Sequence, residues 1–246
     1  MDIQKQDELS KKMLDKYKET WLTPLSEGIH LTHLTGCITK AYWRVKAPLP
    51  HTDETSLYFL TGIGFEQFLT QGEGKPEPLN IDGIWMSPDY KDDVHGYTEI
   101  KSTRSWINKK TGEPTYGWSK HWIRQIMGYC KGLNVTEWNV VALFIVAAKL
   151  LGRKFVFTQG ELDEFWNKFI IPRRDVLLTA LEKHTPPQPF AYNDDWECKS
   201  CEFRIFCEAH IAEQCFIPRS SDTDKQFLER SDYESADTEN GEGQGD

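Results

Sequence analysis

Acidic and basic side chains alternate in the stretch TEIKSTR, Thr98 to Arg104. Glu99 and Lys101 are two positions apart in a segment that predicts a β-strand, so both side chains point to one face. An exposed pair of this kind would be a surface ion pair of small energetic value. Beside a second acidic residue, the same pair could form half of a catalytic site. The sequence must therefore supply that second acid.

A candidate for the second acid, Asp82, lies in the run LNIDGIWM. The run predicts a strand over residues 79–86, followed by a turn-rich connection and a second strand over residues 95–103. We therefore expect Asp82 and Glu99 on neighbouring strands. The dipeptide Asp82-Gly83 has an alternative interpretation, because it is also a common turn signal.

Divalent metals such as Mg²⁺ and Mn²⁺ prefer oxygen ligands, usually one or two carboxylates together with water and substrate phosphate. The predicted ligands are Asp82, Glu99 and the backbone oxygen of Ile100. Lys101 would orient or help to deprotonate the attacking water, or stabilise charge in the transition state. A metal, a positioned water and a nearby cation are what phosphodiester hydrolysis requires.

Two predicted helices carry further polar residues. Gln125 and Tyr129 are four apart in a segment with helical spacing over residues 116–133, so they share one face. Upstream, the stretch GIGFE places Glu66 on another predicted helix, where its carboxylate could be a further metal ligand. The alternatives are an ordinary polar pair on an amphipathic helix and a solvated surface glutamate.

Three of the six cysteines form the pattern C-x2-C-x5-C: Cys198, Cys201 and Cys207. A C-x-x-C pair lets two thiolates bind one metal centre, and a third can close round it. Cys37 is the predicted fourth ligand, and it would join the two ends of the fold by closing a long loop. The competing interpretation is a zinc site whose fourth ligand is either Cys37 or His210.

The order of these motifs resembles the PD-(D/E)XK nucleases, in the RecB-like branch that carries an iron–sulfur cluster. The nearest family is the CRISPR-associated Cas-four nucleases, and the resemblance covers about residues 30–210. That branch usually has a histidine where this chain has Glu66, which leaves the metal preference and the activity open. The motifs, in order, are Cys37, Gly62 with Glu66, Asp82, Glu99-Ile100-Lys101, Gln125 with Tyr129, and Cys198, Cys201 and Cys207.

The resemblance implies an α/β fold with a PD-(D/E)XK restriction-endonuclease-like core, a mixed central sheet flanked by helices, whose N- and C-terminal segments are joined by a metal cluster. It implies a Mg²⁺- or Mn²⁺-dependent DNA exonuclease acting at single-stranded ends, in DNA processing, recombination or CRISPR spacer acquisition. It also implies a 4Fe–4S cluster on the cysteines, and a role for Gln125 and Tyr129 in holding DNA and the site. Two rivals stay open: a weak or inactive nuclease-fold DNA-binding module, and an interaction subunit of a larger DNA-processing or CRISPR adaptation complex.

Bases and aromatics are interleaved between the E-x-K and Q-x-x-x-Y motifs. Bases neutralise phosphates, and aromatic rings stack on unpaired nucleobases. The predicted DNA contacts are Arg104, Lys120 and Arg124. Trp118 and Trp122, which are four apart, are expected to face the core instead.

The 246 residues predict one nuclease domain over residues 1–218. Its N-terminal helices lie within residues 1–50, and the cysteine-rich segment 196–215 closes the cluster site. Residues 219–246 carry nine acidic and three basic side chains and are predicted to be a disordered tail. The net charge of −9 does not exclude a nucleic-acid partner, because the rest of the chain is nearly neutral.

No apolar run is long enough to span a membrane, and the first residues are polar. We therefore expect neither a signal peptide nor a membrane partner, and we expect a cytoplasmic protein whose thiols stay reduced. Cys130 and Cys215 are predicted to be thiols without a metal role.

Overall fold

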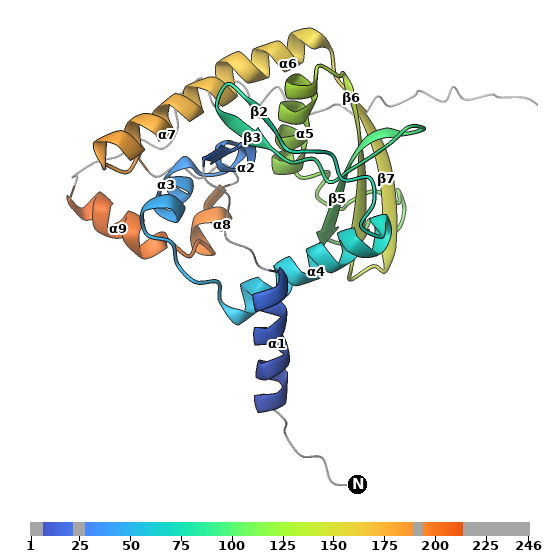
Figure 1. Cartoon of the computed structure of the whole chain (residues 1–246), viewed down its shortest axis with the longest axis horizontal. Helices are drawn as coiled ribbons and strands as arrows, with labels where there is room; N and C mark the ends of the chain where they lie inside the picture. The colour runs from blue at the N-terminus through green and yellow to red at the C-terminus, as the bar shows by residue number, and fades with distance from the viewer. Residues whose placement is uncertain (1–6, 22–27, 189–193, 214–246) are drawn as a thin grey trace, which may run out of the picture.

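The computed structural model describes residues 7–21, 28–188 and 194–213 (Figure 1). They form a mixed α/β structure in which helices flank two sheets. The helical elements are α1 (Asp7–Trp21), α2 (Leu31–Thr35), α3 (Ile38–Lys46), α4 (Asp53–Thr70), α5 (Lys120–Leu133), α6 (Gln159–Phe165), the π-helical stretch η1 (Trp166–Ile170), α7 (Ile171–Lys183), α8 (Asp194–Lys199) and α9 (Arg204–Glu213). The strands are β1 (Ile29–His30), β2 (Leu79–Ile81), β3 (Ile84–Met86), β4 (Tyr90–Asp92), β5 (Gly96–Thr103), β6 (Glu137–Phe144) and β7 (Lys149–Val156).

The larger sheet has the strand order β4-β5-β6-β7, and its central pair, β5 and β6, is parallel. The other two pairs are antiparallel. Alternate residues of β6 are buried on the face toward α5, as the period of a strand requires. These are Trp138, Val140, Ala142 and Phe144. The strand predicted over residues 95–103 therefore lies between β4 and β6, and β5 is an interior strand.

The smaller sheet corrects one sequence expectation. Residues 79–86 are not a single strand, because the chain reverses at Asp82 and Gly83, whose φ angles are 52° and 78°. Positive φ at both central residues is the geometry of a two-residue type I′ hairpin turn, for which Asp-Gly is a preferred sequence. The turn interpretation of this dipeptide is confirmed.

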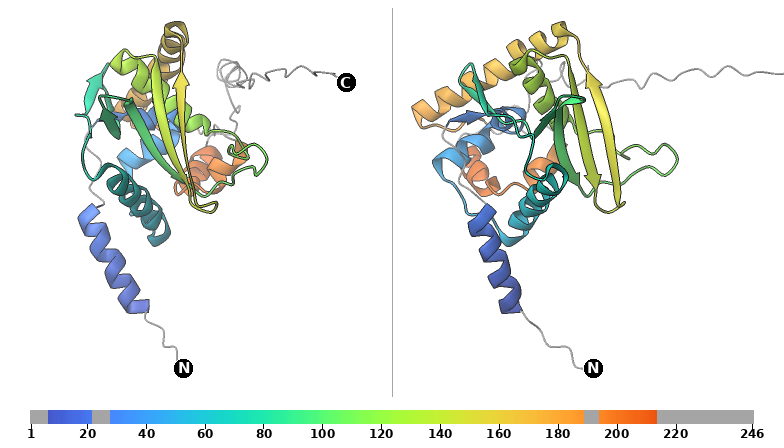
Figure 2. Two further views of the ribbon diagram at one scale, coloured as in Figure 1. Left: turned by 90° about the vertical axis from the view of Figure 1, so that its right-hand side faces the viewer. Right: turned by 45° about the vertical axis from the view of Figure 1, so that its right-hand side comes forward.

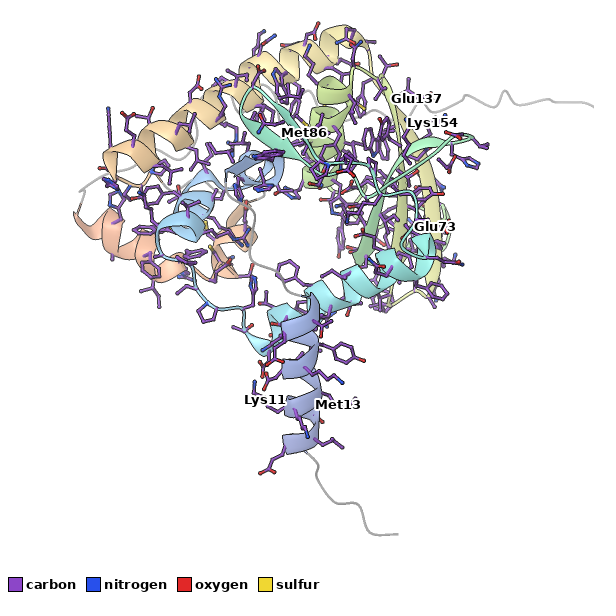
Figure 3. The ribbon with its side chains drawn as sticks, viewed as in Figure 1. Lys11, Met13, Glu73, Met86, Glu137 and Lys154 are labelled. Carbon is purple, nitrogen blue, oxygen red and sulfur yellow. The ribbon has the colours of Figure 1, made fainter. Side chains whose placement is uncertain are left out.

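Helix α5 packs against β6, α2 and α6. Gly128 makes the approach of α2 possible, since a Cβ atom there would lie 2.5 Å from Leu31 Cδ2. One turn further along α5, Gly132 lies against the buried side chain of Met86 from β3, which is labelled in Figure 3. The helix that carries the Gln–Tyr pair is therefore held from several directions.

The pattern of residues 35–46 predicts one helix, whereas the structure divides the region at Gly36 and Cys37, between α2 and α3. Arg173 of α7 donates hydrogen bonds to the carbonyl oxygens of Leu34 and Gly36 at this break. These bonds satisfy carbonyls that the end of α2 leaves unpaired. Helix α7 thereby holds the segment that carries Cys37.

The pattern of residues 161–184 predicts one long helix that is bent or interrupted at Pro172. In the structure α6, η1 and α7 follow one another without a gap, and the π-helical stretch η1 lies directly ahead of α7, whose second residue is Pro172. Phe165 and Phe169 stack across this region with ring centroids 5.2 Å apart. The change of helix type therefore comes before the proline rather than at it.

Helix α1 projects from the body and is joined to α4 by the ion pair of Lys18 with Asp53 (Figures 1 and 3). None of the helices within the described residues is long and apolar enough to cross a membrane. The predictions for Cys215 and for the tail, residues 219–246, lie outside the described residues.

Candidate active site

Glu99 and Lys101 are not a surface ion pair. Both lie on the interior strand β5, on the face that α5 covers, and Glu99 is 0% exposed. The ammonium group of Lys101 contacts Glu99 Oε1 directly. A buried pair of a carboxylate and an ammonium is costly to desolvate, and it persists only when the two charged groups lie close together. The first alternative posed by the sequence is therefore excluded.

Gln125 and Tyr129 of α5 complete the contacts of Glu99. Gln125 Nε2 donates to Glu99 Oε1 at 2.8 Å and to the Tyr129 hydroxyl at 2.8 Å. The Tyr129 hydroxyl in turn donates to the carbonyl oxygen of Ser87 at 3.2 Å. Burial raises the pKa of Tyr129 well above its usual value, so the hydroxyl stays a donor. Both residues of this motif are buried and join strand to helix, as the one-face spacing predicts.

The acid nearest to Glu99 is Asp89, which sequence analysis missed. Asp89 follows Pro88 and precedes β4, and continuing the antiparallel pairing of β4 with β5 places it opposite Glu99. Its Oδ2 atom accepts a hydrogen bond of 2.9 Å from the amide of Ile100. A signal was present, because the dipeptide Pro88-Asp89 stands ten residues ahead of E-x-K.

Asp82 is held elsewhere, and its assignment as a metal ligand beside Glu99 is wrong. It lies in the β2–β3 turn of the smaller sheet, whereas β5 belongs to the larger sheet. Its Oδ2 atom accepts from the indole nitrogen of Trp166 at 3.0 Å, and its backbone oxygen accepts from Arg174 at 2.8 Å. Asp82 therefore ties the turn to the α6–α7 region.

Burial dominates the electrostatics of the two carboxylates. It raises the pKa of Glu99 to about 8, against the lowering effect of Lys101, and the nearby Asp89 raises it further. Burial also raises the pKa of Asp89. Glu99 Oε2 has no hydrogen-bond partner among the described residues. A desolvated acidic pair with an unused oxygen favours binding of a cation.

Glu66 of α4 lies at the edge of this group. Its charge acts on both Asp89 and Lys101, so the carboxylate faces the site. Its Oε1 atom is engaged by the Lys75 ammonium at 2.9 Å. Lys75, which sequence analysis also missed, adds a second cation beside the carboxylates. Binding of a metal to Glu66 would require this ion pair to open.

We call Asp89, Glu99, Lys101, Gln125 and Tyr129 the carboxylate centre. Within residues 7–21, 28–188 and 194–213, no three Asp, Glu, His or Cys side chains are placed closely enough to hold a metal ion as they stand. Mg²⁺ needs only one or two protein carboxylates, with water and phosphate filling the remaining positions. Asp89, Glu99 and the unused Oε2 atom fit that requirement. The backbone oxygen of Ile100 stays a predicted ligand.

Four thiols from three parts of the chain form a second group, which we call the cysteine centre. Cys37 caps the start of α3, Cys198 is in α8, Cys201 lies between α8 and α9, and Cys207 is in α9. Burial raises the pKa of Cys207 to about 12. Cys37, Cys198 and Cys201 lie near enough to Cys207 to raise its pKa as well. Besides burial, Cys37 also raises the pKa of Cys201, so the Cys37 segment lies near the late cysteines.

The surroundings of the cysteine centre suit thiolate ligands. The buried indole nitrogen of Trp43 has no regular acceptor, and it favours the thiolate form of Cys207. Lys40 favours the thiolate of Cys201. A metal that replaces the thiol protons would therefore meet donors and positive charge already in place. The donor set of four thiols fits an iron–sulfur cluster or zinc.

The predicted DNA contacts divide into two kinds. Arg104 is exposed at the end of β5, where its guanidinium contacts Tyr58 of α4, and Lys120 is half-buried at the start of α5. Arg124 is 5% exposed and its guanidinium lies 5.1 Å from the ring centre of Phe169. A buried guanidinium is poorly placed to reach a phosphate, so the structure does not favour Arg124 as a DNA contact, and that contact stays a prediction.

The tryptophans and Cys130 take the places expected of them. Trp118 and Trp122 pack against the buried cluster that includes Phe144 and Ala142. Cys130 is buried in the main core, and burial raises its pKa to about 12. These residues stabilise the structure around the site without facing it.

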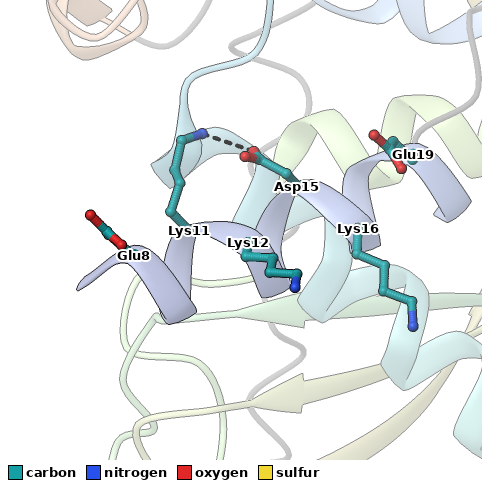
Figure 4. Close-up of a pocket in the computed structure, with 6 residues that line it drawn as sticks. All are labelled: Glu8, Lys11, Lys12, Asp15, Lys16 and Glu19. Carbon is teal, nitrogen blue, oxygen red and sulfur yellow. Dashed lines mark hydrogen bonds and ion pairs between the residues drawn. The ribbon is translucent and has the colours of Figure 1, made fainter. Parts of the chain in front are cut away.

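A hollow outside the two centres lies on α1 (Figure 4). It is lined by charged side chains of that one helix, and Lys11 pairs with Asp15 across one turn at 2.8 Å. Such i, i+4 pairs on an exposed helix are worth a few tenths of a kilocalorie per mole. The hollow is a solvated helix face.

Comparison with known proteins gives the fold alone. No protein-family model and no curated protein matches the chain. Among solved structures, the chain is similar to one described as "Crystal structure of SSO0001", with a TM-score of 0.54 and 18% sequence identity over 82% of this chain and 97% of that chain. At that identity the similarity concerns the arrangement of helices and strands, not the chemistry.

Proposed function

We propose that this chain is a metal-dependent deoxyribonuclease of the PD-(D/E)XK type. The observation that carries the proposal is the carboxylate centre, in which Asp89 and Glu99 lie opposite each other with the Lys101 ammonium against them. In this assignment Pro88-Asp89 and Glu99-Ile100-Lys101 are the two halves of the motif. Asp89 replaces Asp82 as the first metal ligand.

The proposed reaction is hydrolysis of a phosphodiester bond. A bound Mg²⁺ or Mn²⁺ would polarise the phosphate and lower the pKa of a water molecule. Asp89 and Glu99 would hold the ion, and Gln125 keeps Glu99 oriented through its bond to Oε1. Lys101 would orient the attacking water, whose oxygen bonds to phosphorus as the bond to the leaving sugar oxygen breaks. The proton released by the water balances the one taken up by the leaving oxygen.

The cysteine centre is proposed to hold a 4Fe–4S cluster, with zinc as the alternative. The effect of the other three cysteines on the pKa of Cys207, with a nearby indole N–H and Lys40, supports four-thiolate ligation. The cluster would join α3 to α8 and α9. Its proposed role is to stabilise the fold, in keeping with its place away from the β5 strand. An absorption spectrum together with iron, sulfide and zinc analysis separates the two occupants.

A second candidate function is supported by the Glu66–Lys75 ion pair. Glu66 stands where the nucleases that this chain resembles carry a ligating histidine, and its carboxylate is already bound by the Lys75 ammonium. A chain with a weakened metal site would be a DNA-binding or scaffold subunit of a DNA-processing complex. The same residues would then hold nucleic acid without cutting it.

One experiment tests the primary proposal. End-labelled single-stranded DNA is incubated with anaerobically purified protein in Mn²⁺, in Mg²⁺ and in chelator, beside the Lys101→Ala variant. We expect metal-dependent cleavage that the variant loses. No cleavage by a folded, metal-loaded wild type would reject the nuclease, and DNA binding by that protein would support the scaffold function.

A further inference from the structure

The connection between β5 and α5, residues 104–119, is a stiff projection. Figure 2 shows it as the green loop that stands out from the larger sheet. Its two arms are paired through an isolated bridge between Ile107 and Pro114. Further backbone bonds join Asn108 to Glu113 at 2.8 Å and Thr115 to the Trp106 carbonyl at 2.9 Å. We call this segment the projecting loop.

Side chains anchor the base of the projecting loop to the sheet. Ile107 is buried in a cluster with Ala142 and Phe144 of β6. Glu113 accepts hydrogen bonds from the Trp118 indole at 3.3 Å and from Arg153 Nε at 3.0 Å. Because both arms are fixed, side chains on the loop are presented without a large ordering cost on binding.

Two aromatic rings of the projecting loop are directed to solvent. Trp106 is 59% exposed and Tyr116 is 86% exposed. The Thr115–Trp106 backbone bond brings the two arms together at this level, so both rings lie at the same part of the loop. This contrasts with Trp118, which packs inward from the next turn of chain. Neither exposed ring contributes to the core.

The same loop is positively charged in a protein of net charge −9. Arg104, Lys109 and Lys110 are all exposed, and the loop's acidic residue, Glu113, is paired with Arg153. Arg104 follows β5 directly, and five extended residues span at most about 17 Å between Lys101 and Trp106. The aromatic rings are therefore within a few nucleotides of the carboxylate centre.

We propose that the projecting loop binds unpaired nucleobases of a single-stranded nucleic acid. Trp106 and Tyr116 stack on bases, and Lys109 with Lys110 neutralises the adjacent phosphates. Base stacking tolerates any sequence, because each base has a π-face. The inference deepens the proposed function, since it selects single strands as the substrate of the carboxylate centre.

The test compares a Trp106→Ala/Tyr116→Ala double variant with wild type in chelator, where no cleavage occurs. Binding of fluorescent oligothymidylate of about 20 nucleotides is followed by anisotropy, and we expect about a 10-fold or larger loss in the double variant. Binding of a blunt duplex should change less than about 2-fold, because paired bases are not available for stacking. Tyr17→Ala, at a ring 52% exposed on α1, is the matched control and should bind like wild type.

An abasic strand of the same length separates stacking from charge. Wild type should bind it as weakly as the double variant binds oligothymidylate, whereas Lys109→Ala/Lys110→Ala should weaken both strands and reduce the salt dependence. Equal binding of oligothymidylate by wild type and the double variant would overturn the inference. So would an equal loss in Tyr17→Ala.

Failure of this inference can be told apart from failure of the proposed function. A phosphodiester too short to reach the loop, such as a thymidine nitrophenyl phosphate, should be hydrolysed at the same rate by wild type and the double variant. Its hydrolysis together with unchanged strand binding would reject the loop and keep the nuclease. Lost strand binding in a protein that hydrolyses neither substrate would keep the loop and reject the nuclease.

Discussion

The carboxylate centre and the cysteine centre are assembled in opposite ways. The carboxylate centre lies on an interior strand and a helix that several elements hold, and its members already bond to one another. The cysteine centre gathers side chains from α3 and from the α8–α9 region, and its thiols are linked by their effect on the pKa of Cys207. One site is fixed by secondary structure, and the other brings separate segments together.

The two centres differ in how far their geometry depends on a bound metal. Glu99 is oriented by Gln125 and Lys101, so its geometry survives without a metal. The raised pKa values of Cys201 and Cys207 keep these thiols protonated, and ligation must displace the protons. We expect loss of metal to abolish chemistry at the first centre and to loosen structure at the second.

The largest effect should come from Lys101→Ala. Removing the cation beside the reacting phosphate should lower the cleavage rate about 10³-fold. The fold should survive, because Glu99, left without its partner, keeps a proton. Rates on end-labelled single-stranded DNA measure the loss of cleavage, and a thermal melt measures whether the fold survives. A variant that cuts within 10-fold of wild type would remove Lys101 from the mechanism.

Asp89→Asn and Asp82→Asn form the sharpest pair. We expect Asp89→Asn to lower cleavage about 10²-fold, because it removes a charged metal ligand. Asp82→Asn should cut almost as wild type, because that side chain bonds to Trp166 and Asn tolerates the positive φ of the turn. The opposite order of the two rates would restore Asp82 as the ligand.

Cys201→Ala tests the expectation that the metal of the cysteine centre stabilises the fold. Loss of a bound metal at 100 to 1,000 times its dissociation constant removes about 3–4 kcal/mol of stability. We expect a colourless protein with a lower melting temperature, while Cys130→Ala keeps the metal because that thiol is in the core. A variant that retains its iron or zinc in full would exclude Cys201 as a ligand.

The smallest effect concerns pH in metal-free protein. Folding raises the pKa of Glu99 to about 8, so this group stabilises the fold at low pH and loses its contribution as pH rises from about 4.5 to 8. Glu99→Gln removes this titration, so the stability of the variant should fall less between pH 4 and pH 8 than that of wild type. Melting curves across that range check the sign, and stabilisation confined to acid would contradict it.

Sequence patterns predicted the parts of the site that depend on local spacing. The E-x-K pair needs only the period of a strand, and Gln125 with Tyr129 needs only the turn of a helix. Which acid faces Glu99 depends on the pairing of the three-residue strand β4, which carries almost no pattern of its own. The apolar run LNIDGIWM favours Asp82 as a strand residue, because the two-residue turn at Asp82 and Gly83 does not interrupt the apolar pattern.

The same limit applies to the charged and aromatic residues near the site. Arg124 is separated by one turn of α5 from half-buried Lys120, and only the packing of Phe169 decides that Arg124 is inside. Helical spacing placed Trp118 and Trp122 in the core correctly. It gave no information on Trp106 or Tyr116, because their exposure depends on backbone bonds within a loop.

Arg173 and the segment that carries Cys37 have a consequence for the order of events during synthesis. The chain leaves the ribosome from its N-terminus, so Asp89, β5, α5 and the pairing strand β6 are made before α7, α8 and α9. Cys37 must wait for Arg173 to hold its segment and then for Cys198, Cys201 and Cys207. The residues of the carboxylate centre are therefore all made while Cys37 is still a single thiol, and a metal held by the four proposed cysteine ligands would bind late.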